Sequence, residues 1–66
     1  MKIRYDPKAD TLTLVLRATP VHERDEVKPG VILDYDRERN LVGIEIRNAS
    51  SCVDNPQSVS LIVGET

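Results

Sequence analysis

Apolar and polar residues alternate along several short stretches of the chain. In residues 11–17, three leucines occupy every second position, and polar or β-branched residues stand between them. The same period of two recurs in residues 31–35 and 42–46. Successive side chains of a β-strand point to opposite faces of a sheet, so the pattern predicts half-buried strands that share one core.

Turn-forming residues separate these runs and set the bounds of the expected strands. The fold class that we predict is mostly β: an antiparallel meander of five to six short strands with little or no helix, in one domain over residues 1–66. Ile3 and Tyr5 of the first strand should point inward. Pro29 and Gly30 have the order typical of a type II turn. The expected strands are residues 2–5, 11–17, 21–27, 31–36, 41–47 and 58–63.

Residues 21–27 differ from the other runs because they carry almost nothing to bury. Their charged side chains include Glu23, Asp25 and Glu26. Charges on an outer strand protect a sheet against unwanted pairing, so this stretch is predicted to be an edge strand. We also expect a basic protein partner to dock on this stretch or on an exposed strand edge, by strand addition.

The small size of the chain points to self-association. A 66-residue chain without Phe or Trp buries only about 60% of its unfolded surface when it folds. A single cysteine, Cys52, excludes an internal disulfide, and no metal-ligand spacing is present. We therefore predict a twofold homodimer, joined through strand edges or through the second face of the sheet. That face would include Thr13, Val15, Ile32, Leu41 and Gly43.

Charge and hydropathy set limits on partners and location. The net charge of −2 and the pI near 5.2 argue against nucleic acid as the main partner, since phosphate binding needs a basic face. No run approaches the 18 or more apolar residues of a membrane span, and the first residues lack the pattern of a signal peptide. A lone cysteine fits a reducing compartment. We expect a cytoplasmic protein with no membrane contact.

Carboxylates are the main candidates for chemistry. Paired carboxylates can bind a hard cation or transfer protons, but Asp6 and Asp10 flank a proline turn and favour a structural role. Asp34 and Asp36 are expected on the polar side of their strand. Glu45 shares a face with Leu41 and Gly43, and it would need an ion-pair partner if that face were covered. The candidate partners are Arg47, Arg17 and Arg4.

Other reactive residues have no motif around them. His22 is expected to be exposed, and Cys52 is expected to be small and half-buried without an activating base. Gly43 inside a strand indicates either a bulge or a close approach by another sheet or subunit. We predict no catalytic, cofactor-binding or metal-binding residue. The candidate interaction residues are Glu23, Asp25, Glu26, Leu41, Gly43 and Glu45.

Several short motifs follow one another along the chain. They are Tyr5-Asp6-Pro7, Ala9-Asp10, Leu12 with Leu14, the run from Pro29 to Asp36, the run from Leu41 to Ile46, Ala49-Ser50, and Asn55-Pro56 followed by Ser58-Val59. In this order they resemble the motifs of a small prokaryotic family called domain of unknown function 2283. That family usually has Gly where this chain has Arg39 in the loop before the Leu-Val-Gly run, so we expect Asn40 to take the positive-φ position.

The resemblance implies a mostly β domain without an assigned activity. Members of the family are often encoded beside small toxin-like proteins, which suggests an antitoxin or another partner role. The first hypothesis is therefore a non-catalytic protein-interaction module, in one form an antitoxin-like partner of a small toxin. The second is a small-ligand or metal-binding enzyme that uses the Asp-rich loops at a site shared between subunits. A third is a structural accessory domain.

Overall fold

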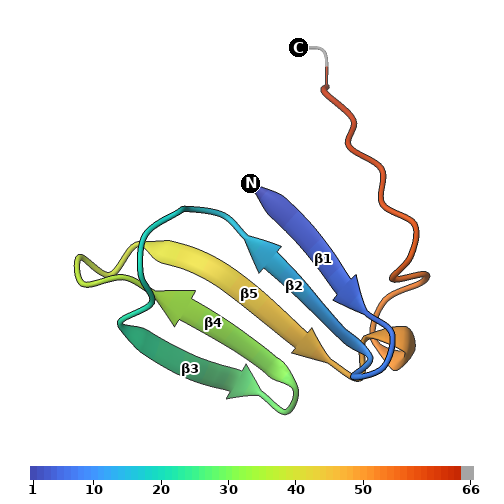
Figure 1. Cartoon of the computed structure of the whole chain (residues 1–66), viewed down its shortest axis with the longest axis horizontal. Coiled ribbons are helices and arrows are strands. Elements are labelled where there is room, and N and C mark those ends of the chain that lie inside the picture. The colour runs from blue at the N-terminus through green and yellow to red at the C-terminus, as the bar shows by residue number, and fades with distance from the viewer. Residues whose placement is uncertain (65–66) are drawn as a thin grey trace.

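The computed structural model describes residues 1–64 and contains one antiparallel sheet of five strands (Figure 1). A single 3-10 turn, η1, follows the last strand, and the tail after it is extended. The predicted fold class is confirmed. The elements are β1 (Lys2–Asp6), β2 (Thr11–Val15), β3 (Glu23–Lys28), β4 (Val31–Tyr35), β5 (Leu41–Arg47) and η1 (Ala49–Ser51).

The strand order across the sheet is β1-β2-β5-β4-β3. Three of the four connections join sheet neighbours, as in a meander, but the chain crosses from β2 to the far edge before it forms β3 (Figure 1). Composition explains this departure. Five of the six residues of β3 are charged and all six are exposed, so β3 suits an outer position, as predicted, whereas the apolar β5 occupies the centre.

The strand register sorts the side chains onto two different faces. Along one row of partners, Ile3 pairs with Leu14, Leu14 with Ile44, and Ile44 with Leu33. The neighbouring row joins Tyr5, Leu12, Ile46 and Val31 in the same way. We call the surface formed by these eight residues the leucine face. Ile3 and Tyr5, predicted to point inward, lie on the side of the leucines, but Ile3 remains 44% exposed.

The opposite side, called the polar face here, carries mainly charged and hydroxyl side chains. The register joins Arg4 to Thr13, Thr13 to Glu45, and Glu45 to Ile32. Arg24 lies opposite Asp34 on the two outer strands. The sheet is therefore amphipathic, with one apolar side and one polar side.

Positive φ angles mark the tight turns. Gly30 has φ 83°, as the predicted type II turn requires. The expectation for the β4–β5 loop is wrong, because Arg39 rather than Asn40 takes the positive value, φ 66°. The reason is local: the backbone N–H and the side-chain amide of Asn40 both donate to Asp36, at 2.9 and 3.2 Å, which holds Asn40 in place.

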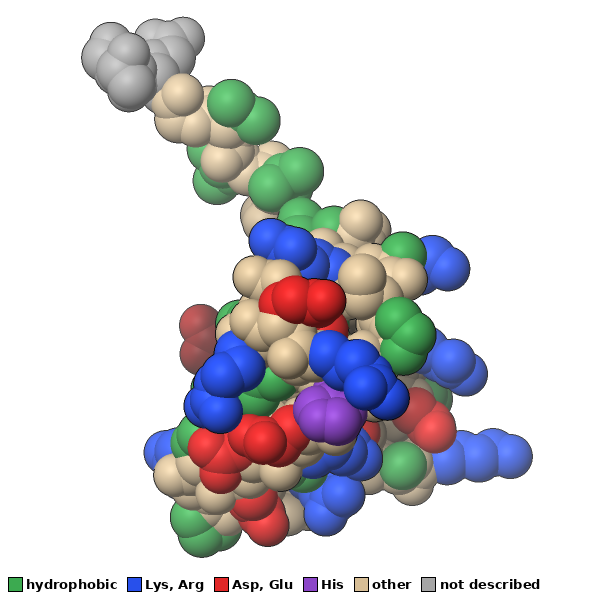
Figure 2. All heavy atoms as spheres, turned by 90° about the vertical axis from the view of Figure 1, so that its left-hand side faces the viewer, with side chains coloured by type: hydrophobic (Ala, Val, Ile, Leu, Met, Phe, Trp, Pro, Cys, Tyr) green, Lys and Arg blue, Asp and Glu red, His purple; other side chains and the backbone are tan. Residues whose placement is uncertain are grey.

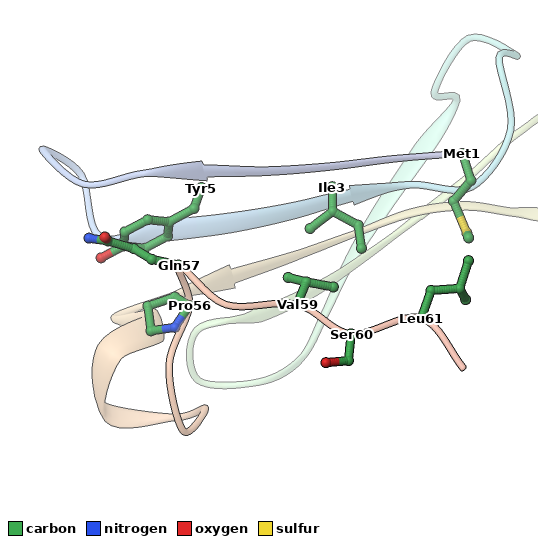
Figure 3. A pocket seen from close by; sticks show the side chains of 8 residues that line it. All are labelled: Met1, Ile3, Tyr5, Pro56, Gln57, Val59, Ser60 and Leu61. Atoms are coloured by element: carbon green, nitrogen blue, oxygen red, sulfur yellow. The ribbon is translucent and has the colours of Figure 1, made fainter. Parts of the chain in front are cut away.

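The predicted strand over residues 58–63 is also wrong. These residues are extended but join no sheet. They run outside the sheet, beyond the free edge of β1 (Figure 1), and their side chains face the side of β1 that belongs to the leucine face (Figure 3). Alternation alone therefore marked an extended segment without indicating what it contacts. No helix of residues 1–64 is long and apolar enough to cross a membrane.

Burial in the described part of the chain is shallow. The buried hydrophobic residues are Leu12, Ile32, Val42 and Ala49. Among residues 1–64, no large side chain is fully buried. A sheet one layer thick gives this result, because its central side chains have neighbours in the sheet but little above them.

Candidate interaction surface

The leucine face is incompletely covered. Within residues 1–64 the strands contact chiefly their neighbours in the sheet, and no helix or second sheet lies over this face. Leu14, Leu33 and Ile44 occupy the central strands, yet each remains partly exposed. Ile3, on the edge strand β1, is 44% exposed. A contiguous apolar surface of this kind is unusual on a soluble monomer.

The total surface area exceeds that of a compact monomer because the open face and the extended C-terminal tail both add to it. The chain exposes 5392 Å², whereas a compact monomer of 7.4 kDa exposes about 4,200 Å². The excess is therefore about 1,200 Å². A standard interface buries about 800 Å² on each partner. The extra surface is large enough to supply a stable interface.

The C-terminal tail, residues 56–64, borders this face along β1. The tail and the strand enclose an open groove of about 530 Å³. Val59 points towards Ile3, and Leu61 lies near Met1 at the other end of the groove (Figure 3). Apolar side chains thus line both walls of a space that the chain does not itself fill.

Towards its end the tail becomes more exposed. Leu61 is 82% exposed and Val63 is 86% exposed, and Ile62 between them is equally open. The space-filling view shows this segment as an arm that leaves the body of the domain with hydrophobic side chains along it (Figure 2). Three consecutive large aliphatic residues in water are costly, because each loses the free energy of burial.

The polar face is closed by an ion-pair network. Arg24 lies 2.8 Å from Asp34 and 3.2 Å from Glu45, and Arg47 lies 3.0 Å from Glu45. The hydrogen bond to Asp34, assisted by Glu45, raises the pKa of Arg24. These side chains surround Ile32, which is buried although it belongs to the polar face. Glu45 therefore has Arg47, one of its expected partners, and also Arg24, which the sequence did not indicate.

Gly43 is buried beside a bulge. A Cβ atom on Gly43 would lie 3.1 Å from the carbonyl oxygen of Leu14, so the close approach comes from the neighbouring strand of the same sheet. The register between β4 and β5 shifts next to it, which places Leu41 opposite Tyr35. Leu41 thus departs from the expected alternation with Gly43 and Glu45, and these three residues do not form one open patch.

The three acidic candidates lie together on the outer strand β3. Glu23, Asp25 and Glu26 are exposed, and β3 is the last strand of the sheet. Glu26 accepts a 3.0 Å hydrogen bond from the backbone N–H of Gly30. The structure therefore places these residues at an accessible edge of the sheet, and the tail runs beside the other edge, β1 (Figure 1).

Asp10 connects two distant turns. It accepts hydrogen bonds from the hydroxyl of Tyr5 at 2.7 Å and from the backbone N–H and hydroxyl of Ser50 at 3.0 and 2.7 Å. The hydrogen bond from the Ser50 hydroxyl, followed by that from Tyr5, lowers the pKa of Asp10. The hydrogen bond between Tyr5 and Asp10 also raises the pKa of Tyr5. Asp6 has a similar local role, since it accepts the N–H of Lys8 at 3.0 Å.

Asp36 organises the β4–β5 loop. Its buried carboxylate accepts the backbone N–H groups of Glu38 at 3.0 Å and Asn40 at 2.9 Å. The N–H of Asn40 is the main cause of the lowered pKa of Asp36. Asp34 is bound in the ion-pair network on the polar face. Each carboxylate of the Asp-rich segments therefore has a structural partner.

The remaining candidates for chemistry lie on the surface. His22 is exposed, as predicted. Cys52 is exposed as well, so the expectation of a half-buried thiol is wrong; its loop after η1 has no second layer to cover it. Among residues 1–64, no three His, Cys, Asp or Glu side chains are grouped so that they could hold a metal ion.

The comparison with known families agrees with the fold. A family described as "Protein of unknown function (DUF2283)" matches residues 2–50. The chain belongs to the DUF2283 family. The matched part holds all five strands and enters η1, whereas the C-terminal tail lies outside it. The resemblance predicted for this DUF2283 domain is confirmed. No curated protein and no solved structure matched the chain.

Proposed function

We propose that this DUF2283 domain is a non-catalytic protein-interaction module that binds through its leucine face. The observation that carries the proposal is the single-layered sheet, whose apolar side is left partly exposed on its central strands. A folded protein gains stability when such a surface is buried, and another polypeptide can bury it. The polar face, in contrast, is occupied by its own ion pairs.

The carboxylates support a binding role over an enzymatic one. Asp10 and Asp36 are saturated by hydrogen bonds from Tyr5, Ser50 and Asn40, which fix turns. A general acid or base needs a titratable group that is free to reach its substrate. The groove beside the tail has apolar walls, which suit the side chains of a polypeptide.

The finer form of this proposal is an antitoxin-like protein that binds a small basic toxin. The acidic and exposed strand β3 supports a basic partner, since an outer strand offers unpaired backbone groups together with the charges of Glu23, Asp25 and Glu26. The test is co-expression with the product of the neighbouring gene, for the wild type and for a variant with Lys at all three positions. Capture that ignores this charge reversal would contradict docking at β3.

Footprinting with a photoactivated diazirine tests the interaction module itself. At nanomolar concentration the purified chain is alone, and Leu33, Ile44 and Ile3 should be labelled strongly. Val42 and Ala49, which are buried, provide the internal control. If the leucine face were shielded in a chain that sedimentation shows to be monomeric at this dilution, the chain would cover the face by itself, and the proposed function would be wrong.

A further inference from the structure

We propose that a second copy of this chain covers the leucine face, so that two sheets form a twofold sandwich whose open flanks are closed by the C-terminal tails. The proposal rests on the function proposed above and names its first partner. It concerns the leucine face and residues 56–64, and it leaves the outer edge of β3 free for another protein.

The available area favours a second copy as the occupant. The chain exposes about 1,200 Å² more than a compact monomer of its mass does. A standard interface uses about 800 Å² from each partner, so the leucine face and the tail together can supply it. An apolar face of aliphatic side chains is complementary to itself, because two such sheets pack about 10 Å apart and interdigitate. Closed twofold association then leaves no further apolar surface open.

Charge selects the direction of the twofold axis. Asp25 and Glu23 pair with Leu33 and Tyr35, so they border the leucine face along β3. An axis across the strands would lay β3 on β3 of the second copy and bring these carboxylates together. An axis along the strands places β3 over β1 of the second copy instead. On the leucine face β1 presents Ile3 and Tyr5, which carry no charge at neutral pH, so this arrangement separates the carboxylates and removes the repulsion.

The tail completes the sandwich at its flanks. It leaves η1 and runs along the outer edge of β1 (Figure 1), where Val59 points towards Ile3 of the leucine face (Figure 3). With β3 of the second copy above β1, the tail lies at the corner between the two sheets. Leu61 and Val63, exposed in one chain, then meet the second copy. Twofold symmetry places the other tail at the opposite flank, so both open sides are closed.

The tail gives the first pair of variants. In an isolated chain Leu61 is 82% exposed, so Leu61→Asp cannot disturb the sheet. In the sandwich it should raise the dimer dissociation constant by about 100- to 10,000-fold, because the twofold dimer loses two buried leucines, one from each tail. Ser58→Asp is the matched control, because it adds the same charge to the same tail at a polar position. Light scattering after gel filtration at micromolar concentration gives the mass, and analytical ultracentrifugation gives the constant.

The two faces give the second pair of variants. Ile3 on the leucine face is 44% exposed and Val15 on the polar face is 38% exposed. They are similar in size and exposure but lie on opposite sides of the sheet. Ile3→Asp should convert the dimer to monomers, and Val15→Asp should leave it intact. Circular dichroism of both variants checks that the sheet persists.

The expected result is a wild-type mass of twice 7.4 kDa, lost in Ile3→Asp and Leu61→Asp and retained in both controls. A dimer that resists Ile3→Asp, or one that only Val15→Asp dissociates, would overturn the proposal. So would a dimer that is equally stable with Leu61→Asp and Ser58→Asp. A wild-type monomer at all micromolar concentrations whose leucine face is labelled would exclude the second copy but keep the interaction module. A monomer whose own tail shields that face would exclude both.

Discussion

The hydroxyl of Tyr5 donates a 2.7 Å hydrogen bond to the carboxylate of Asp10, across the turn between β1 and β2. The same carboxylate accepts two hydrogen bonds from Ser50, forty residues further along the chain. Asp10 therefore joins the first hairpin to η1, from which the tail departs. Since η1 precedes the tail, this link also fixes where the tail begins to run along β1.

Replacement of Asp10 should weaken the fold most clearly near neutral pH. Asp10→Asn removes the charge and one of the acceptor oxygens, so the hydroxyls of Tyr5 and Ser50 lose their strongest partner. We expect a melting temperature several degrees lower at pH 7, measured by circular dichroism. Asp54→Asn, at an exposed position in the loop after η1, is the control and should leave the melting temperature unchanged.

The effect of Asp10 on stability should depend on pH, because folding lowers the pKa of its carboxyl group. The folded chain holds the pKa of Asp10 below its ordinary value of 3.8. The stabilisation by this carboxylate is thus present above pH 3.8 and is lost as the pH falls through the folded pKa. Wild type and Asp10→Asn should therefore converge in stability as the solution is acidified below that value. If the difference between them were constant from pH 7 to pH 2, the ionised carboxylate would not be the cause.

The left-handed conformation of Arg39 predicts a substitution that stabilises the chain. Its φ of 66° is unfavourable for a residue with a Cβ atom, and glycine adopts it without steric cost. Arg39→Gly should stabilise the chain by about 0.5–1 kcal/mol, after the extra chain entropy of glycine is subtracted. Chemical denaturation gives the free energy. Arg37→Gly, in the same loop but without a positive φ, should be neutral or destabilising, and equal effects of the two would contradict the interpretation.

The strands could be predicted from the sequence because alternation acts residue by residue. The bounds of β5, the outer position of β3 and the contact of Glu45 with Arg47 all follow from periodicity and charge. Alternation does not say what covers each face. Alternation therefore predicted a strand over residues 58–63. It also predicted a dimer contact through the polar face, where Gly43 and Ile32 are already buried.

Interactions between distant residues were the part that the sequence could not supply. Arg24 reaches Glu45 only because the chain crosses the sheet between β2 and β3, which brings β3 beside β4 and near β5. The link between Asp10 and Ser50 likewise depends on where β5 ends. The open leucine face could have been predicted from the lack of a helical pattern in the sequence, because a single sheet without helices has nothing to pack on its apolar face.

The ion pairs on the polar face should respond to salt. Arg24→Met keeps the aliphatic part of the side chain over Ile32 but leaves Asp34 and Glu45 without their shared cation. The side chain of Arg24 is half exposed, so we expect a loss of only about 0.5–1 kcal/mol at low ionic strength. The difference from wild type should shrink in molar sodium chloride because salt screens exposed charges. Arg37→Met in the exposed β4–β5 loop should show neither effect, and a loss independent of salt would indicate packing instead of charge.

Gly43 offers the sharpest test of the sheet's interior. A methyl group there would lie 3.1 Å from the carbonyl oxygen of Leu14, which is tighter than an ordinary contact. That carbonyl belongs to the central pair β2–β5, so it cannot move without disturbing the strands on both sides. Alanine normally stabilises a strand relative to glycine by about 0.5–1 kcal/mol through chain entropy, but the clash outweighs this gain. We expect Gly43→Ala to cost about 1–2 kcal/mol in urea denaturation.

The control for this substitution is in the same chain. Gly64 has no atom within 4 Å of the position that a Cβ would take, so Gly64→Ala should leave the free energy of unfolding unchanged. A stable Gly43→Ala variant would mean that β2 and β5 can separate slightly. The bulge between Gly43 and Leu41 would then absorb the methyl group, and the backbone between β2 and β5 would not be as closely packed as the 3.1 Å approach indicates. If Gly43→Ala loses stability and Gly64→Ala does not, the nearby carbonyl oxygen of Leu14 is the reason that position 43 requires glycine.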